Sequence, residues 1–322
     1  MGKIILFGKR LPSIDAQKIS PEPDWKQCDP AFIRKALRHA LQRPSGGWYV
    51  VDDAVAIGTQ PKSYEIDGRE LVAFRCNGRI VIGQNSCPHL GGPLAGGRIR
   101  DGKLVCPWHG LEIDPETGHD HWQAFPVYDD GLLVWVQMGS KDEATPKPIL
   151  APRPDPNRSI AAIIRREAAC EPDDVIANRL DPWHGHHYHP HTFASLVVTD
   201  VSIERLTLRV AYRVLGPFCV EVDATFHSPE PRTIVMTIVA GEGLGSLVET
   251  HATPIAPGRS VVTEATIATS ERPEFRFALK MGSLIRPLMK KAAHRLWLED
   301  AAYTERAYAL RTKSRRSRKD RA

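Results

Sequence analysis

The sequence predicts an α+β protein in which an all-β domain is followed by a curved antiparallel sheet with a long C-terminal helix packed across it. Three observations support this fold class. A length of 322 residues suggests about two domains. Short β-branched or alternating runs fill the first half, and a second series of such runs ends in one long helical pattern.

The order of these patterns divides the chain into five segments. Residues 1–45 are Pro-rich and form an N-terminal extension. Residues 46–140 form the all-β domain, and the Pro-rich segment 141–156 is the linker. Residues 157–310 form the second domain. Residues 311–322 are a basic tail that we expect to be disordered and solvated.

Short runs with Gly or Asp turns between them predict the strands of the first domain. One helical pattern, at Pro30–Gln42, precedes them. The expected strands are Trp48–Val51, Ser63–Ile66, Glu70–Arg75, Arg79–Ile82, Lys103–Cys106 and Leu132–Val136.

The second domain is predicted to contain an antiparallel sheet and a helix. Its expected strands are Ser195–Ile203, Thr207–Val214, Cys219–His227, Thr233–Ala240, Gly245–Pro254 and Ser260–Ala268. The helix begins at Pro287, a residue suited to a first turn, and ends near Leu310. Its apolar stripe includes Leu288, Ala292 and Leu296, which indicates one face packed against the sheet.

Two motifs sixteen residues apart, Cys87-Pro-His89 and Cys106-Pro-Trp-His109, each offer one thiolate and one imidazole. Two thiolates suit one iron and two imidazoles suit the other, which is how a Rieske [2Fe–2S] cluster is bound. A structural zinc site uses the same ligand types, but a zinc finger places two Cys in one half and two His in the other. The spacing therefore favours the cluster.

The segment Cys87–Gly110, CPHLGGPLAGGRIRDGKLVCPWHG, resembles the Rieske proteins. Rieske subunits of respiratory and photosynthetic complexes carry an extra Cys in each ligand loop, and the two are joined as a disulfide. The corresponding positions here are Gly92 and Trp108. The loops therefore resemble those of the Rieske ferredoxins and oxygenases, which take electrons from a reductase and not from a membrane quinol.

A histidine-rich segment in the second domain holds another motif. Five of the thirteen histidines lie between positions 184 and 191. The segment resembles the Rieske non-haem iron oxygenases, whose motif is Asn-x-x-Asp-x-x-His-x₄-His, and the matching positions are Asn178, Asp181, His184 and His189. Its Asp-Pro-x-His form is nearer to the pheophorbide a oxygenase and ketosteroid hydroxylase type. This resemblance implies a helix-grip (START-like) catalytic domain.

The resemblance implies a mononuclear iron(II) held by two imidazoles and a carboxylate. That ligand set leaves one face of the metal open for O₂. His184 and His189 supply the imidazoles, and Asp300 on the C-terminal helix matches the family's late aspartate. Two alternatives stay open. His187 is three residues after His184 and shares its helical face, and Glu299 neighbours Asp300.

Asp181 resembles the aspartate that, in this family, joins a cluster histidine of one subunit to an iron-ligating histidine of the next. A carboxylate there orients the imidazole and offers a hydrogen-bonded route for the electron. Asp181 also suits a helix N-cap ahead of Pro182, and both roles are compatible. Asn178 is expected next to the iron ligands without binding the metal.

Together the two motifs predict an oxygenase component that oxidises a lipophilic substrate by hydroxylation, demethylation or desaturation. The alternative is a non-catalytic Rieske electron-transfer protein with a ligand-binding helix-grip domain. The sequence holds no nucleotide-binding motif, so NAD(P)H would act only through a separate ferredoxin or flavin reductase. The resemblance also implies a homotrimer.

Charge and hydropathy narrow the remaining function classes. The net charge of +5 comes from the tail after residue 310, so no nucleic-acid-binding face is expected. No apolar run is long enough to span a membrane, and peripheral membrane contact is the less favoured interpretation. The cysteines outside the cluster motifs show no regular spacing, which indicates a reducing, cytoplasmic compartment.

Overall fold

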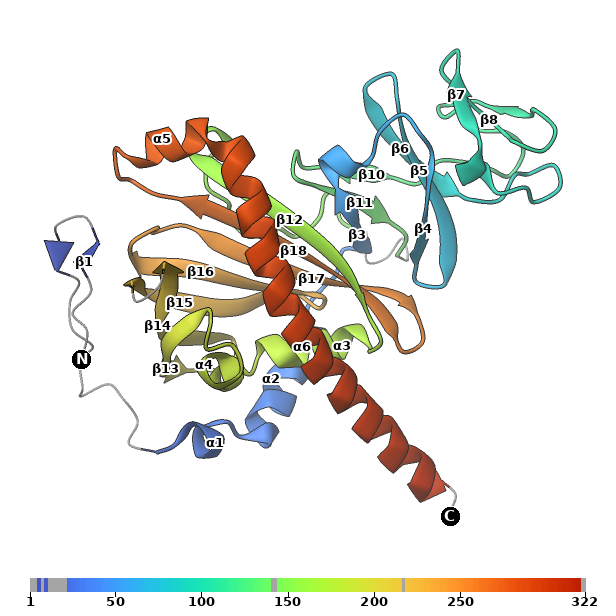
Figure 1. The fold of residues 1–322 in the computed structure, drawn as a ribbon. Helices are drawn as coiled ribbons and strands as arrows, with labels where there is room; N and C mark the ends of the chain where they lie inside the picture. Colours follow the sequence, from blue (N-terminus) through green and yellow to red (C-terminus); the bar gives the residue numbers. More distant parts are fainter. Residues whose placement is uncertain (1–4, 7–8, 11–21, 140–143, 216–217, 320–322) are drawn as a thin grey trace.

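The computed structural model describes residues 5–6, 9–10, 22–139, 144–215 and 218–319 (Figure 1). The predicted order, an all-β domain followed by a sheet-and-helix domain, is confirmed. Within the described ranges, no helix is long and apolar enough to cross a membrane.

Three small antiparallel sheets build the first domain. Their strands are β3 (Trp48–Asp53), β10 (Val127–Asp129) and β11 (Leu133–Gln137) in the first sheet, β4 (Lys62–Ile66), β5 (Arg69–Cys76) and β6 (Arg79–Gln84) in the second, and β7 (Arg98–Arg100), β8 (Lys103–Val105) and β9 (Glu112–Ile113) in the third. The first two sheets bury Ile66, Leu71, Ile82 and Val134 between them. The third sheet carries the two cysteine loops at the far end of the molecule (Figure 1).

A seven-stranded antiparallel sheet forms the centre of the second domain, with the strand order β12-β18-β17-β16-β15-β14-β13. Its strands are β12 (Ser159–Ala168), β13 (Phe193–Val201), β14 (Arg205–Leu215), β15 (Phe218–Glu230), β16 (Thr233–Gly241), β17 (Leu247–Ala256) and β18 (Arg259–Thr269). Each of the strands predicted for this domain is present. Strands β13 to β18 lie next to one another in the order in which they occur in the sequence. The last of them, β18, also pairs with β12, the first strand of the domain.

The long helix α6 crosses one face of this sheet (Figure 1). It buries Trp297 in a cluster with Ile164 of β12, Ile176 of α3 and Ala36 of α2. The helices and 3₁₀ turns are α1 (Asp24–Gln27), α2 (Pro30–Leu41), η2 (Ala54–Ala56), η3 (Leu94–Gly96), η5 (Pro156–Arg158), α3 (Pro172–Arg179), η6 (Pro182–His184), α4 (Gly185–Tyr188), α5 (Phe275–Lys280) and α6 (Gly282–Lys319), and the two-residue strands β1 (Ile5–Leu6) and β2 (Lys9–Arg10) precede them.

The sequence did not predict strand β12. Its apolar run is followed by charged residues, and it becomes a strand by pairing along its whole length with β18, about one hundred residues later. A partner so distant in the sequence leaves no local pattern.

The predicted bounds of the last helix were wrong at both ends. Helix α6 begins at Gly282, and Pro287 lies inside it, where the carbonyl left without an N–H partner belongs to exposed Ser283. The tail expected to be disordered from residue 311 is helical as far as Lys319. Arg311 donates to Asp174 of α3, and cationic side chains interact favourably with a helix C-terminus.

One buried ion-pair network joins the two domains. Arg153 donates to both carboxylate oxygens of Glu249 on β17, at 2.7 and 2.6 Å, and pairs with Asp130 of the first domain at 2.9 Å. His251 contacts Glu249 at 3.3 Å, and its ring meets that of Trp135 edge-on at 5.1 Å. These contacts fix the position of the cysteine-loop domain on the sheet.

Candidate metal centres

The two cysteine loops have the same backbone fold. The N–H of Gly91 donates to the carbonyl of Cys87 at 2.8 Å, and the N–H of Gly110 donates to that of Cys106 at 3.1 Å. Both glycines have a positive φ, 76° and 74°, which a residue with a side chain adopts only with strain. Each loop therefore turns back tightly after its cysteine and presents its histidine at the tip.

The predicted cluster ligands meet at the end of these loops. Cys87 and Cys106 are buried, whereas His89 and His109 are exposed with their ring centroids 5.0 Å apart. Burial and the neighbouring Cys106 thiol raise the pKa of Cys87. Two thiols on the buried side and two imidazoles on the exposed side fit a [2Fe–2S] cluster whose histidine-bound iron faces the surface.

The positions where related loops carry a disulfide are filled differently here. A Cβ added to Gly92 would lie 2.9 Å from the ring of Trp108, so the glycine makes room for the indole. The six cysteines, all within the described residues, form no disulfide. The indole is 57% exposed, which leaves an apolar surface beside the cluster histidines.

The second predicted site brings His184, His189 and Asp300 together. His184 ends η6, His189 follows α4, and Asp300 lies on α6. The Nε2 atoms of the two histidines lie 3.2 and 3.1 Å from Oδ1 of Asp300. Their ligand atoms all lie within 4.8 Å of one another, and His189 and Asp300 are each only 1% exposed. This geometry suits a two-histidine, one-carboxylate iron site.

The second nitrogen of each imidazole faces a carboxylate. Nδ1 of His189 lies 2.6 Å from Glu299, and Nδ1 of His184 lies 3.5 Å from Asp181. Carboxylates in this position orient metal-bound imidazoles and raise their basicity. Glu299, the alternative ligand in the sequence, thus lies behind His189 and away from the point where the three ligand atoms meet.

The structure does not bring His187 to Asp300. Its side chain is 63% exposed, and its Nε2 lies 2.9 Å from Asp24 of α1. The backbone stays right-handed helical from His184 into α4 and leaves the helix at His189, whose φ and ψ are −119° and 54°. The three-residue spacing from His184 does not bring His187 to the other ligands, because its side chain faces Asp24 of α1.

Asp300 is held as a carboxylate. Asn178 donates to its Oδ1 at 3.2 Å, and the Arg179 guanidinium lies 3.6 Å from its Oδ2. Burial alone would raise its pKa, but the contacts with His184 and His189 and the charge of Arg179 hold that pKa well below the usual range. An ionised, buried carboxylate beside two imidazoles is a suitable metal site without further rearrangement.

The pKa of His184 is shifted upward, in the opposite direction to that of Asp300. Burial alone would lower its pKa, but the carboxylates of Asp181 and Asp300 raise it to about 9. In the metal-free protein this imidazole therefore carries a proton at neutral pH, which a metal ion displaces on binding. Metal affinity at this site should rise with pH.

Asp181, expected to pass electrons, is 5% exposed and accepts two further contacts. Cys28 donates to its Oδ1 at 3.3 Å, and the Tyr303 hydroxyl donates to its Oδ2 at 3.2 Å. The ring of Tyr303 also stacks on His184 at 5.2 Å. Despite its burial, the contact with His184 and the hydrogen bonds from Cys28 and Tyr303 lower the pKa of Asp181.

Sequence reasoning missed Cys28, Arg179 and Tyr303. Tyr303 was within reach, because it lies one helical turn after Asp300 and shares its face. Arg179 directly follows Asn178, but the motif does not specify the residue type at that position. Cys28 belongs to a segment far away in the sequence, and no local signal connects it to Asp181.

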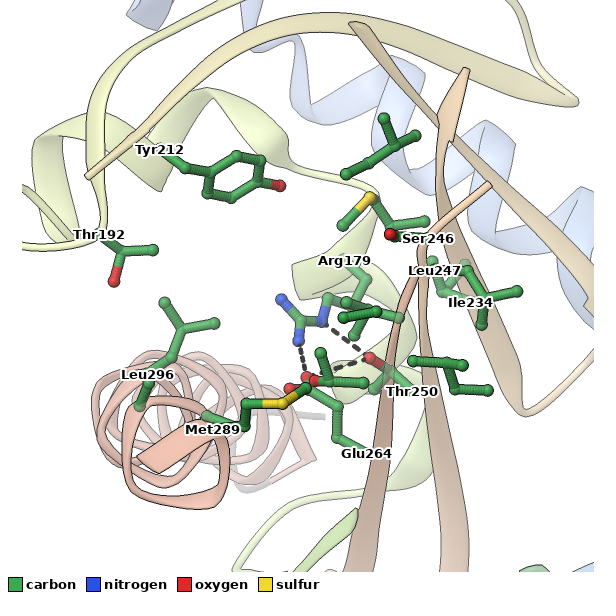
Figure 2. Close-up of a pocket in the computed structure, with 18 of the residues that line it drawn as sticks. Arg179, Thr192, Tyr212, Ile234, Ser246, Leu247, Thr250, Glu264, Met289 and Leu296 are labelled. Atoms are coloured by element: carbon green, nitrogen blue, oxygen red, sulfur yellow. Dashed lines mark hydrogen bonds and ion pairs between the residues drawn. The ribbon is translucent and has the colours of Figure 1, made fainter. Parts of the chain in front are cut away.

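A cavity of about 380 Å³ opens beside this site, between the sheet and α6 (Figure 2). Its walls are mainly apolar, and Thr192 and Phe193, which follow His189 closely in the chain, line it. Arg179 enters from α3, donates to Thr250 at 3.2 Å and forms a short ion pair with Glu264. The cavity is thus a mainly apolar chamber in which the cationic side chain Arg179 also pairs with Asp300.

Comparisons with known proteins identify the domains of the chain. The profile described as "Rieske [2Fe-2S] domain" matches residues 47–128, and the profile described as "Domain of unknown function (DUF5914)" matches residues 139–315. The cluster prediction for the first domain is therefore confirmed.

Two curated relatives are similar to about a third of the chain. The vanillate O-demethylase oxygenase subunit of Pseudomonas sp. (strain HR199 / DSM 7063) is 31% identical over 115 residues, which cover 32% of each protein. The aminopyrrolnitrin oxygenase PrnD of Pseudomonas fluorescens is 35% identical over 94 residues, 28% of this chain and 26% of the relative. The chain thus matches only about a third of the length of these relatives.

Solved structures extend the similarity to both domains. The crystal structure of dicamba monooxygenase bound to dicamba superimposes with a TM-score of 0.66 and 18% identity, covering 85% of this chain and 90% of that one. At this identity the likeness concerns the fold. The predicted fold, a Rieske domain followed by an antiparallel sheet with a long C-terminal helix, is confirmed.

Proposed function

This chain belongs to the family of the domain of unknown function DUF5914, here preceded by a Rieske [2Fe–2S] domain, and from that premise we propose that it is the oxygenase component of a Rieske non-haem iron oxygenase. The observation that carries the proposal is the meeting of His184, His189 and Asp300 beside an apolar cavity. A plain electron carrier has no use for such a site.

In this proposal Cys87, His89, Cys106 and His109 hold the cluster, and His184, His189 and Asp300 hold an iron(II). When bound, the two groups supply single electrons and the reductive activation of O₂. The domain boundaries at 46–140, 141–156 and 157–310 are part of the same proposal.

The surrounding residues keep the proposed iron ligands in their binding state. Asn178 and Arg179 hold Asp300 ionised and fixed through its two oxygens. Glu299 and Asp181 face the second nitrogen of the two imidazoles, so that the first nitrogen presents its lone pair to the metal. Burial of the site keeps bulk water from the carboxylate.

The lining of the cavity supports the proposal of a lipophilic substrate. Aliphatic and aromatic side chains such as Phe226, Ile234 and Met236 cover most of its wall. Its one cation, Arg179, is already balanced by Glu264. A carboxylate substrate would therefore find no free charge at this point, and we infer a neutral substrate that carries an oxygen able to hydrogen-bond with the Arg179–Glu264 pair.

Electron delivery is proposed to occur between subunits of a homotrimer. Figure 1 places the cluster loops beside β7 and β8 at one end of the molecule and α4 near the other, so the two centres of one chain are far apart. Asp181 contacts His184, and in this proposal it links that imidazole to a cluster histidine of a second copy. The electrons would come from NAD(P)H through a separate ferredoxin or flavin reductase, in the cytoplasm.

Metal content and turnover test this proposal. His184→Ala and Asp300→Ala should keep the visible Rieske spectrum, fall from about three irons per chain to about two, and lose O₂-dependent turnover with reductase and a panel of neutral lipophilic compounds. His294→Ala, an exposed histidine elsewhere on α6, is the control. A wild-type protein with only two irons per chain would favour the non-catalytic electron carrier and refute the oxygenase.

A further inference from the structure

Three potential metal ligands lie together outside both proposed iron centres. Asp24 belongs to α1, and His186 and His187 belong to α4. Oδ2 of Asp24 lies 3.6 Å from Nδ1 of His186 and 2.9 Å from Nε2 of His187. Their ligand atoms all lie within 4.8 Å of one another. None of them contributes to the iron ligand set of His184, His189 and Asp300.

A simple hydrogen bond does not account for the whole arrangement. The bond to Asp24 satisfies His187, but Nδ1 of His186 is buried and has no hydrogen-bond partner in the described part of the chain. The two rings lie with their centroids 3.9 Å apart and turn their nitrogens toward the same carboxylate oxygen. An unsatisfied imidazole nitrogen beside a carboxylate is a position that a bound cation or a water molecule would satisfy, and the second histidine on the same carboxylate oxygen favours the cation.

The distances suit a small dication. In a tetrahedral zinc site with bonds of about 2.0–2.1 Å, neighbouring ligand atoms lie roughly 3.3 Å apart. The two contacts of the Asp24 carboxylate, 2.9 and 3.6 Å, lie on either side of that spacing. Imidazole and carboxylate are ligands that zinc accepts, and zinc binds such sets more tightly than iron(II) does.

The backbone around the cluster is held in place by other contacts. Trp183 donates to Gln27 at 3.4 Å and meets the ring of Phe32 edge-on at 6.5 Å. Cys28 donates to Asp181 at the other end of the same segment. Asp24 therefore faces the two histidines because its helix is anchored, and a metal ion would find the ligands already assembled.

We propose that Asp24, His186 and His187 form a second mononuclear site, which binds one divalent transition-metal ion such as Zn²⁺ and fastens α1 to α4. The exposure of His187 leaves a coordination position open to water. Because α1 leads directly to Cys28, the ion would also hold the N-terminal segment against Asp181. The proposal does not depend on oxygenase activity.

Zinc binding tests the site directly. The protein carrying His184→Ala and His189→Ala removes competition at the proposed iron site while its Rieske cluster remains as an internal concentration standard. After exposure to Zn²⁺ and gel filtration, elemental analysis should find one zinc per chain. Adding Asp24→Asn or His187→Gln should abolish that zinc, whereas His294→Gln should retain it.

A second readout separates loss of the site from loss of structure. Zn²⁺ should slow proteolytic cleavage ahead of Pro30 in the parent protein and leave its rate unchanged in the Asp24→Asn variant, with equal Rieske spectra in both. Absence of stoichiometric zinc in the parent, or equal zinc in the Asp24→Asn and parent proteins, would overturn the proposal. Failure of the oxygenase proposal would leave these results unaffected, since no turnover is measured.

Discussion

Glu249→Gln should weaken the connection between the two domains. Glu249 is 1% exposed and receives two hydrogen bonds from Arg153, which also pairs with Asp130 of the Rieske domain. Glutamine keeps the shape of the side chain but removes its charge. The guanidinium then remains buried with one carboxylate in place of two.

The pKa of Glu249 gives the size of the effect. Burial alone would raise it, but hydrogen bonds from His251 and Arg153 lower it from the ordinary value of 4.5 to about 2. A tenfold change in a proton-binding constant corresponds to about 1.4 kcal/mol, so the charged form contributes roughly 3 kcal/mol to the free energy of unfolding. Because the pKa is lower in the folded protein, this contribution is complete above pH 4.5 and is lost as the pH falls towards 2.

Urea unfolding followed by tryptophan fluorescence measures this contribution. At pH 7 the Glu249→Gln variant should lose about 3 kcal/mol relative to the natural protein, and the difference should shrink at pH 3.5. Glu65→Gln is the matched control, since Glu65 also joins the domains, through Arg259 at 3.6 Å, but both side chains are more than 40% exposed. It should cost less than about 1 kcal/mol. Equal losses in the two variants, or a loss independent of pH, would refute the reasoning.

Two further predictions concern the proposed iron site. Asp181→Asn should keep both metals but slow oxidation of the cluster in a single turnover by at least about tenfold, and an unchanged rate in stopped-flow absorbance would contradict a bridging role. Glu299→Gln should weaken iron(II) binding about tenfold in chelator competition, because the partner of His189 loses its charge, and Glu299→Ala should weaken it about a hundredfold. If the Glu299→Ala variant bound iron(II) as tightly as the natural protein does, Glu299 would not support His189.

The cluster loops were predictable because their geometry is local. Cys87 and His89 lie in one tight turn, Cys106 and His109 lie in another, and each turn closes on a glycine within four residues of its cysteine. Residue type and spacing therefore contain most of the information. Strands β6 and β8 beside the loops follow from β-branched runs and turns, which are also local signals, whereas the short strands β7, β9 and β10 were not predicted.

Residues that act through tertiary contacts were not predictable in the same way. Arg179 matters because α3 points it toward Glu264 and Asp300, which lie on β18 and α6. Cys28 reaches Asp181 only because α1 and α2 fold back over η6. Neither residue has a periodic or spaced partner in the sequence, and only the folded chain brings them to the site.

The choice between His187 and His189 shows how a spacing rule can mislead. A regular helix from His184 would place His187 on the same face, three residues on. The chain instead leaves the helix at His189, whose φ and ψ are −119° and 54°, and the N–H of His189 closes this short helix on the carbonyl of Gly185 at 2.8 Å. That closure directs His189 inward to Asp300 and leaves His187 outside, facing α1. The histidines of this segment are therefore divided between the short helix and the residue that ends it, and both proposed mononuclear sites depend on that division.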